Sequence, residues 1–463
     1  MILGLNYLRT INKILIERWK GMKLENLTFK GGVHVPHNKE MTEKKALEYA
    51  KEPSIVYIPL HQHTGAPCEP LVKVGDNVKV GQKIGESQAF VSAPIHSSVS
   101  GTVKNITTIT TPTGINAKCV VIESDGANQM DEGIQPKGSL DNLSSKEIIQ
   151  IIKESGITGM GGAGFPTHVK LSPPPDKKID TVIINGAECE PFLTSDHRIM
   201  LEMPEKVVFG LKAIMKALNV ERGFIGIENN KMDAVDALKA VIKDEDNINI
   251  VTLKTKYPQG DEKRLINAVT GRMVPSGGLP MDVSCVVNNV STAKAIAEAI
   301  LEGKPVYERV VTVTGNGVNE PKNLIVKIGT PFQEVIDQAG GFNGAPGKVI
   351  MGGPMMGLSQ FTTDVPVIKG SGGILVLTEE EALAEKVSPC IKCGKCLEAC
   401  PVFLQPLYIS AYALKSNLQG AERYGALDCV ECGSCSFVCP AKRPLVESIR
   451  FAKREILAKR KKS

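Results

Sequence analysis

Two cysteine-rich runs near the C-terminus constrain the fold of this chain more than any other feature of its sequence. The first run, CIKCGKCLEACP, covers residues 390–401, and the second, CVECGSCSFVCP, covers residues 429–440. Both have the spacing C-x2-C-x2-C-x3-C-P, which is typical of bacterial ferredoxin domains that hold two [4Fe–4S] clusters. The chain is therefore expected to contain a helical, ferredoxin-like domain at this end.

The ferredoxin pattern is crossed, because the fourth cysteine of each run binds the cluster of the other run. It assigns Cys390, Cys393, Cys396 and Cys439 to cluster 1, and Cys429, Cys432, Cys435 and Cys400 to cluster 2. Gly394 and Gly433 leave backbone amides free to turn toward the cluster sulfurs. Zinc, the alternative, uses two C-x2-C pairs and has no need of a third cysteine at the same spacing. The apolar segment between the runs predicts helices that dock this domain onto its neighbours.

The length and composition predict several globular domains. A chain of 463 residues exceeds a single hydrophobic core, and 42% hydrophobic with 23% charged residues is typical of globular proteins. No apolar run is long enough to predict a membrane-spanning helix. Eight of the twelve cysteines fall in the two runs, which indicates metal binding in a reducing compartment rather than disulfides. The other four, Cys68, Cys119, Cys189 and Cys285, are expected to be small apolar residues.

Basic segments lie at both ends of the chain. Residues 1–22 carry charges throughout an apolar stretch and lack the cleavage site of a signal peptide. They are expected to be either a basic amphipathic helix or an extension upstream of a true start at Met22. Residues 441–463 carry nine Lys or Arg and two Glu, a net charge of +7. No nucleic-acid-binding motif accompanies them, so they favour an acidic partner or a membrane surface, with a merely solvated tail as the alternative.

A glycine-rich loop lies in the middle of the chain. Ser144 and Glu147 form a capping box that predicts the start of a short helix, which Gly156 ends. The following residues 159–164 match G-x-G-x-x-G, but the dinucleotide fingerprint should follow a strand, and here a helix precedes it. The loop is therefore not predicted to be an ordinary Rossmann fingerprint. It can still be a loop whose backbone amides bind a phosphate or a flat ring.

Three further stretches place polar residues where a short apolar strand ends. They are TVIINGAECEP (181–191), KYPQGDEK (256–263) and CVVNNVSTA (285–293). Open α/β sheets bind ligands at the carboxyl ends of their strands. The glycine loop and these three stretches together predict one ligand site in an α/β domain.

The motifs GMGGAGFPTHVK, INGAECEP, YPQGDE and VVNNVST, in this order, resemble the flavin- and NADH-binding subunit of respiratory complex I. With the N-terminal TFKGGVHVPHNKEMTEKK and the double cysteine run, the chain resembles the C subunits of Rnf complexes. These complexes are the ion-translocating ferredoxin:NAD+ oxidoreductases of bacterial membranes. The resemblance covers about residues 22–455.

The resemblance implies a set of cofactor-binding residues. The glycine loop along FMN and nicotinamide would contribute Gly159, Gly161, Gly162, Gly164 and Lys170, with Phe165 stacking against NADH. Flavin-contacting positions are Asn185, Glu188 and Cys189, and Glu190 matches a residue that binds NADH. The flavin and nicotinamide wall would contain Tyr257, Gly260, Asp261 and Glu262, and the ribityl phosphate would lie at Asn288, Asn289 and Thr292. The sequence departs from the family at Ala187, where an acidic contact is missing.

The expected fold class is multidomain α/β. Its segments are a basic amphipathic extension or non-native start (1–22), an N-terminal segment (23–53), a barrel-sandwich hybrid (54–125), a Rossmann-like α/β flavin and NADH domain of complex I type (138–305), an SLBB-like β-grasp domain (306–378), an α-helical ferredoxin-like domain with two [4Fe–4S] clusters (379–455) and a basic tail (456–463). The barrel-sandwich hybrid resembles biotinyl and lipoyl carrier domains but lacks a lysine between Ser87 and Ser97, so a structural role is expected. The β-grasp domain is expected to be a spacer without a ligand.

The resemblance implies an electron-transfer function without a catalytic acid or base. Hydride would pass between NAD(H) and non-covalent FMN, and single electrons between FMN and the two clusters. Expected partners are the membrane subunits and the ferredoxin-like subunit of an Rnf complex, and indirectly ferredoxin, at the cytoplasmic face of the bacterial membrane. Two alternatives remain: a cobalamin reductase-like protein of a bacterial microcompartment, and a cluster relay subunit that lacks flavin.

Overall fold

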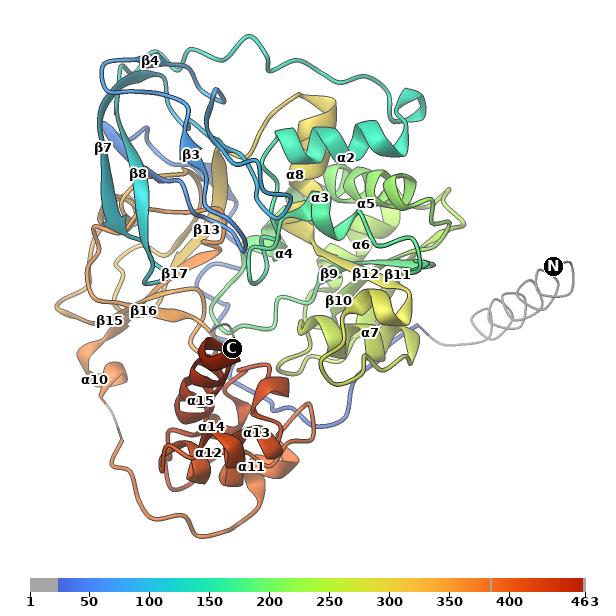
Figure 1. Cartoon of the computed structure of the whole chain (residues 1–463), viewed down its shortest axis with the longest axis vertical. Coiled ribbons are helices and arrows are strands. Elements are labelled where there is room, and N and C mark those ends of the chain that lie inside the picture. Colours follow the sequence, from blue (N-terminus) through green and yellow to red (C-terminus); the bar gives the residue numbers. More distant parts are fainter. Residues whose placement is uncertain (1–23, 384, 461–463) are drawn as a thin grey trace, which may run out of the picture.

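The structure is a computed structural model that describes residues 24–383 and 385–460. The predicted N-terminal extension and the last three residues of the basic tail lie outside this described part. Four structural modules follow one another along the chain, and the helical C-terminal module lies below the other three in Figure 1. No helix in the described part is long and apolar enough to cross a membrane.

The first module is a small β-sandwich made of two antiparallel sheets. The four-stranded sheet has the order β2-β8-β7-β4, and the three-stranded sheet has the order β3-β5-β6. The strands are β2 (Ile55–Pro59), β3 (Glu69–Pro70), β4 (Asn77–Val78), β5 (Lys83–Glu86), β6 (Ile95–His96), β7 (Gly101–Thr110) and β8 (Asn116–Ser124). Apolar residues of both sheets, including Ile58, Ile84 and Ile122, form one core between them. This is the arrangement expected of a barrel-sandwich hybrid.

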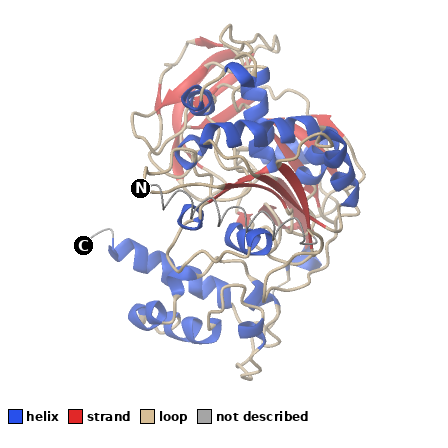
Figure 2. Cartoon of the chain, turned by 90° about the vertical axis from the view of Figure 1, so that its right-hand side faces the viewer, coloured by secondary structure: helices blue, strands red, loops and turns tan. Residues whose placement is uncertain are grey.

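The second module is a parallel sheet with helices on both faces (Figure 2). Its strands are β9 (Thr181–Gly186), β10 (Gly223–Glu228), β11 (Ile248–Leu253) and β12 (Cys285–Asn289), in the spatial order β11-β10-β9-β12. Its helices are η1 (Leu140–Asn142), α2 (Ser145–Glu154), α3 (Thr167–Lys170), α4 (Ser195–Glu202), α5 (Pro204–Leu218), α6 (Met232–Val241), α7 (Glu262–Thr270), η2 (Pro280–Val283) and α8 (Val290–Leu301). The strands are almost wholly apolar because both faces of the sheet are covered.

The strand order of this module determines where a ligand can bind. The chain moves outward from β9 to β10 and β11, and then returns to the other side of β9 with β12. The connections of β9 and β12 therefore leave the sheet in opposite directions, and sheets of this kind bind their ligands at the carboxyl ends of two such strands. Asn185 and Asn289 are register partners at these ends.

The third module is a mixed six-stranded sheet in the order β1-β14-β13-β17-β15-β16. Its strands are β1 (Leu47–Tyr49), β13 (Glu308–Thr314), β14 (Lys322–Lys327), β15 (Pro346–Met351), β16 (Leu358–Gln360) and β17 (Gly373–Thr378). Helix α9 (Phe332–Gln338) packs Phe332 and Ile336 into its core, and α10 (Glu379–Ala382) follows the last strand. Strand β1 comes from the N-terminal segment and pairs in parallel with β14, a connection that the sequence did not predict.

The fourth module is helical and contains the two cysteine runs. Its helices are α11 (Lys395–Glu398), α12 (Pro406–Ala413), α13 (Leu418–Arg423), η3 (Ala426–Asp428), α14 (Ser434–Phe437) and α15 (Leu445–Arg460). The helices between the runs pack mainly within the module, through Ile409 and Ala421 against Ile449 of α15. The expectation that this segment docks the module holds only at its two ends, where the Pro401 carbonyl accepts from Arg264 Nη1 (2.8 Å) and Asp428 accepts from Ser276 Oγ (2.7 Å). Helix α15 also runs on past residue 456, where a separate tail was expected.

Candidate functional site

The asparagines that the sequence predicted lie at the carboxyl ends of the neighbouring strands β9 and β12. Asn185 Nδ2 donates to the Gly260 carbonyl (2.8 Å), and its Oδ1 accepts from Ala187 N (3.0 Å). Asn289 caps α8 by accepting from Ser291 N (2.8 Å). The buried Nδ2 of Asn288 has no hydrogen-bond partner. A buried amide without a partner is rare in proteins, so this group is available for an acceptor atom of a ligand.

The glycine-rich loop closes over the start of α8. Gly159 N donates to the Phe165 carbonyl (2.9 Å), and Met160 N donates to Thr292 Oγ1 (3.1 Å). A Cβ on Gly161 would lie 2.7 Å from Nδ2 of Asn289, whereas a Cβ on Gly162 would meet nothing within 4 Å. The backbone at residues 161–163 is exposed. The loop thus presents bare main chain next to a helix N-terminus, which suits an anionic or flat ligand.

The barrel-sandwich module holds the other side of this loop. Thr64 Oγ1 donates to the Ala163 carbonyl (2.7 Å), and Thr64 N donates to the Gly164 carbonyl (3.1 Å). Gly164 has φ +65°, so its left-handed conformation favours glycine. Phe165 follows it and is half-buried. The sandwich module, expected to be only structural, therefore also shapes the glycine loop.

The YPQGDE segment forms a second wall. Lys170 Nζ donates to Glu262 Oε1 and to the Val287 carbonyl, both at 2.7 Å. Asp261 caps α7 by accepting from Arg264 N (3.0 Å), and burial raises the pKa of Asp261. A Cβ on Gly260 would lie 2.4 Å from the Ala187 carbonyl oxygen, so only glycine allows this close approach.

Residues 188–190 connect this wall to the start of α4 and to the third module. The Glu188 carboxylate accepts from Ser195 Oγ (3.2 Å), Asp196 N (2.9 Å) and His197 N (3.3 Å), at the start of α4. Cys189 Sγ accepts from Gly260 N (3.3 Å), and burial raises the pKa of this thiol. The Glu190 carboxylate accepts backbone bonds from the third module instead of facing an open crevice. The direct cofactor contacts of these three residues stay predictions.

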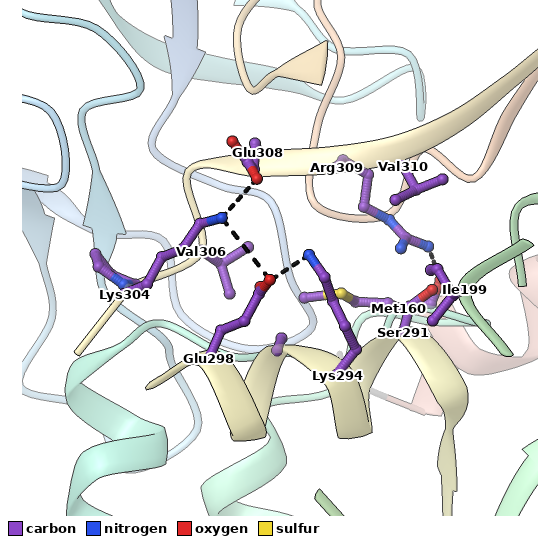
Figure 3. Close-up of a pocket in the computed structure, with 12 residues that line it drawn as sticks. Met160, Ile199, Ser291, Lys294, Glu298, Lys304, Val306, Glu308, Arg309 and Val310 are labelled. Carbon is purple, nitrogen blue, oxygen red and sulfur yellow. Dashed lines mark hydrogen bonds and ion pairs between the residues drawn. The ribbon is translucent and has the colours of Figure 1, made fainter. Parts of the chain in front are cut away.

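Two buried cations that the sequence did not point out hold these loops. Arg309, at the start of β13, donates from Nη2 to the Met160 carbonyl (2.8 Å), as Figure 3 shows. Lys39 Nζ donates to the Glu190 carbonyl (2.9 Å) and lies 4.0 Å from the Glu188 carboxylate. The sequence offered one sign of the role of Arg309, which is a charged residue near the start of an apolar strand. Nothing in the sequence around Lys39 indicated that this residue is buried.

Arg309 also balances buried negative charge next to the glycine loop. Asp196 accepts from Asn289 Nδ2 (2.6 Å) and Ser291 Oγ (2.7 Å). Burial and the charge of Glu188 raise the pKa of Asp196 to about 6, and Arg309 opposes this rise. The third module, expected to be a spacer, thus supplies a charge to the second module.

The small cavity in Figure 3 belongs to the interface between α8 and β13. Its volume is about 20 Å³, enough for a single water. Lys294 pairs with Glu298 (2.8 Å), and Lys304 pairs with Glu308 (2.6 Å). Lys304 also lies 3.8 Å from Glu298, so these paired buried charges join the two modules.

The two cysteine runs have the same local fold. Lys392 and Glu431 occupy equivalent positions and have φ 56° and 57°, while Gly394 and Gly433 have φ 80° and 77°. Lys392 N donates to Cys390 Sγ and Glu431 N donates to Cys429 Sγ, both at 3.4 Å. Backbone amides that turn toward cysteine sulfurs are what a cluster-binding loop requires. The runs therefore fit a pair of [4Fe–4S] clusters.

The charges of neighbouring thiols influence one another within the crossed sets. Burial raises the pKa of Cys435, and the neighbouring thiols of Cys429, Cys432 and Cys400 add to the rise. Burial likewise raises the pKa of Cys396, with smaller contributions from its neighbours Cys439 and Cys390. Within the described part of the chain, no three His, Cys, Asp or Glu side chains converge on a single metal-ion position. The neighbours of Cys435 and Cys396 belong to the sets that the ferredoxin spacing assigns to cluster 2 and cluster 1.

The loops that carry Cys400 and Cys432 lie against the second module. Tyr257 OH donates to the Cys432 carbonyl (2.8 Å), and Arg264 Nη1 donates to the Pro401 carbonyl (2.8 Å). A Cβ on Gly31 would lie 2.7 Å from the Cys400 carbonyl oxygen. Cys400, Cys432 and Cys435 are buried, whereas Cys390 and Cys393 of the cluster 1 set are exposed.

Comparison with known proteins supports each module. Family models match the RnfC barrel sandwich hybrid domain over residues 27–127, the Nuo51 FMN-binding domain over 152–298, the SLBB domain over 310–359 and the 4Fe-4S dicluster domain over 386–443. These matches confirm the predicted fold class, and they define a flavin- and iron–sulfur-binding redox protein. The cofactors are FMN and two [4Fe–4S] clusters.

Relatives identify the family. The C subunit of the Na(+)-translocating ferredoxin:NAD(+) oxidoreductase complex of Acetobacterium woodii is 53% identical over 441 residues, which are 95% of this chain and 100% of the relative. The C subunit of the proton-translocating complex of Clostridium ljungdahlii is 52% identical over 429 residues, 92% of this chain and 94% of the relative. The chain belongs to the family of C subunits of these ion-translocating (Rnf) complexes, as the sequence motifs predicted.

A structural similarity also exists outside the family. The air-oxidized NAD+-reducing [NiFe]-hydrogenase matches 70% of this chain and 65% of its own chain, with 17% sequence identity and a TM-score of 0.49.

Proposed function

We propose that this chain is the peripheral electron-transfer subunit of a membrane-bound, ion-translocating ferredoxin:NAD+ oxidoreductase. The bound flavin supplies the ability to exchange a two-electron hydride for single electrons, which clusters alone cannot do. The observation that carries the proposal is the contact of Tyr257 with Cys432, because it joins the flavin module to a cluster loop. The names of the relatives support the same activity and do not favour the cobalamin reductase alternative.

The crevice residues would hold the flavin. Asn289 and Thr292 lie at the start of α8, whose helix dipole and free amides favour a phosphate group. The unpartnered Asn288 amide can donate to an oxygen of the ribityl chain or phosphate. Lys170, fixed by Glu262 and the Val287 carbonyl, would place its ammonium group beside the ring. The bare backbone of Gly161 and Gly162 would leave room for a flat ring.

NAD(H) would bind on the open side of the glycine loop. Phe165 is half-buried next to exposed main chain, so its ring can stack against nicotinamide. No proton-transfer residue is needed for hydride exchange. The work of the protein is therefore to hold the two rings in contact and to exclude water from them.

We infer that cluster 2 exchanges electrons with the flavin and that cluster 1 exchanges them with the partner. Three of the four cluster 2 cysteines are buried, and Cys432 among them packs against Tyr257 of the second module, while Cys390 and Cys393 are exposed. Around them Ile391 is 69% exposed and Leu397 is 38% exposed, with exposed Lys392 and Lys395 between them. An apolar surface with basic residues suits an acidic electron-transfer partner. Other members of the complex, including its ferredoxin-like subunit, would dock here and hold the chain at the cytoplasmic face of the membrane.

Anaerobic reduction of the reconstituted chain by NADH tests this function. We expect about eight irons and one non-covalent FMN per chain, with flavin absorbance bleached first and cluster absorbance afterwards. Eight irons without flavin, and no response to NADH, would leave only a relay protein and overturn the proposal.

A further inference from the structure

Glu190 lies where three modules meet. Its Oε1 accepts from Met356 N (2.8 Å) and its Oε2 accepts from Met355 N (3.1 Å), both in the loop 352–357 between β15 and β16. Oε1 also lies 3.4 Å from the hydroxyl of Tyr257, whose single proton goes mainly to the Cys432 carbonyl at 2.8 Å. The carboxylate thus contacts Tyr257 of the second module and the loop 352–357 of the third module, called the β-grasp loop below. Through Tyr257 it is also linked to the cluster 2 ligand Cys432.

We propose that Glu190 is a positioning residue that fixes Tyr257 and the β-grasp loop against the cysteine loop of cluster 2. It does this instead of binding the dinucleotide, the role that the family resemblance implies. The inference rests on the proposed electron path from flavin to cluster 2.

The hydrogen bonds of the carboxylate support this role. Both oxygens already accept backbone N–H bonds, and hydrogen bonds to an ionised group are stronger than neutral ones. A nucleotide hydroxyl that displaced them would leave two amides of a packed loop without partners. Lys39 holds the main chain of the same residue from the other side, by donating to the Glu190 carbonyl (2.9 Å). Glu190 is therefore held in place by the β-grasp loop and by the N-terminal segment.

The β-grasp loop is packed on both sides. A Cβ on Gly353 would lie 2.2 Å from Glu190 Oε2 and 2.8 Å from Glu190 Cβ. On the other side, the Met355 carbonyl oxygen would lie 3.0 Å from a Cβ on Gly433, between two cluster 2 ligands. A shift of Glu190 would therefore displace the β-grasp loop, which in turn would displace the cysteine loop at Gly433. The rate of electron transfer falls steeply with separation, so a loosened cysteine loop slows the oxidation of flavin by the cluster.

Two variants break the same contact from opposite sides. Glu190→Gln keeps the shape but turns an NH2 group toward one of the two loop amides. Gly353→Ala leaves Glu190 chemically intact and pushes it away by the clash described above. Gly370→Ala is the matched control in the same module, because a Cβ there would meet nothing within 4 Å.

The measurements separate a positioning role from nucleotide binding. In the full reconstituted chain without NADH, we expect both variants to raise amide hydrogen exchange about tenfold in peptides covering 352–357 and 429–436. With NADH, the KM and the rate of flavin bleaching should stay within about twofold of the parent, while cluster reduction slows about tenfold. The EPR signal of cluster 2 should shift and that of cluster 1 should not. Gly370→Ala should resemble the parent in every measurement.

The opposite pattern would overturn the inference. A KM for NADH raised about tenfold in Glu190→Gln, with unchanged hydrogen exchange and unchanged cluster reduction, would make Glu190 a dinucleotide ligand. Failure of Gly353→Ala to fold leaves Glu190→Gln as the test. If the parent chain itself binds no flavin or ignores NADH, the proposed function fails, but the hydrogen-exchange comparison still decides whether Glu190 fixes the two loops.

Discussion

The two cysteine runs have the same spacing and the same backbone turns, yet they lie in opposite environments. Cys390 and Cys393 of the first run are exposed, whereas Cys432 and Cys435 of the second are buried. The second run is covered by Tyr257 of the flavin wall, among other groups. Spacing thus determines how each run turns, and contacts from other modules determine which of its cysteines are buried.

The largest expected effect comes from removing one ligand from each cluster. Cys432→Ser and Cys393→Ser should each lower the iron content from about eight to about four per chain. NADH should then bleach the flavin but reduce no cluster in Cys432→Ser, whereas in Cys393→Ser it should still reduce the remaining cluster. Iron assays with EPR after NADH addition check this. Loss of cluster reduction in both variants would contradict the order in which cluster 2 precedes cluster 1.

The difference in exposure also predicts unequal release of iron. With a chelator under mild oxidation, half of the iron should leave about tenfold faster than the rest, because oxidants and chelators reach exposed ligands first. Following the EPR signals of both clusters during release identifies which one is lost. Release of all the iron in a single phase would mean that burial of the second run does not protect its cluster.

The third prediction concerns the contacts that cover cluster 2. Arg264 is 4% exposed and donates to the Pro401 carbonyl (2.8 Å), so Arg264→Met leaves a buried acceptor without its partner. We expect a loss of about 1–3 kcal/mol in the free energy of unfolding. Lys442→Met removes an exposed ion pair with Glu385, which lies near the first run. This variant should change the free energy of unfolding by only about 0–1 kcal/mol. Denaturant unfolding of both holoproteins measures the difference, and equal losses would contradict it.

The contrast between local turns and contacts from distant modules also explains how far the sequence could predict the fold and the site. The cysteine spacing, the capping box at Ser144 and the strand ends at Asn185 and Asn289 are local patterns, so they could be predicted and appear in the structure. The roles of Lys39 and Arg309 depend on contacts between residues far apart in the chain. No local pattern indicates such contacts, and so the sequence did not show that the β-grasp module packs against the glycine loop.

The smallest expected effect compares one glycine with its counterpart in the other run. Gly394 and Gly433 have φ 80° and 77°, so alanine at either position is strained by about 1–2 kcal/mol. A Cβ on Gly394 would meet nothing within 4 Å, whereas a Cβ on Gly433 would lie 3.0 Å from the Met355 carbonyl oxygen. Gly433→Ala should therefore be destabilised by about 1 kcal/mol more than Gly394→Ala, because overpacking adds to the strain.

Comparing the two glycine variants separates the loss of stability caused by backbone strain from the loss caused by contact with the β-grasp loop. Backbone strain is common to both variants, so the difference between their unfolding midpoints in denaturant reports only the contact with the β-grasp loop. Gly433→Ala should also slow reduction of cluster 2 by NADH, and Gly394→Ala should not. Equal midpoints would show that the Met355 loop yields to a methyl group without loss of stability. The burial of the second run would then depend on Tyr257 and Arg264 rather than on the third module.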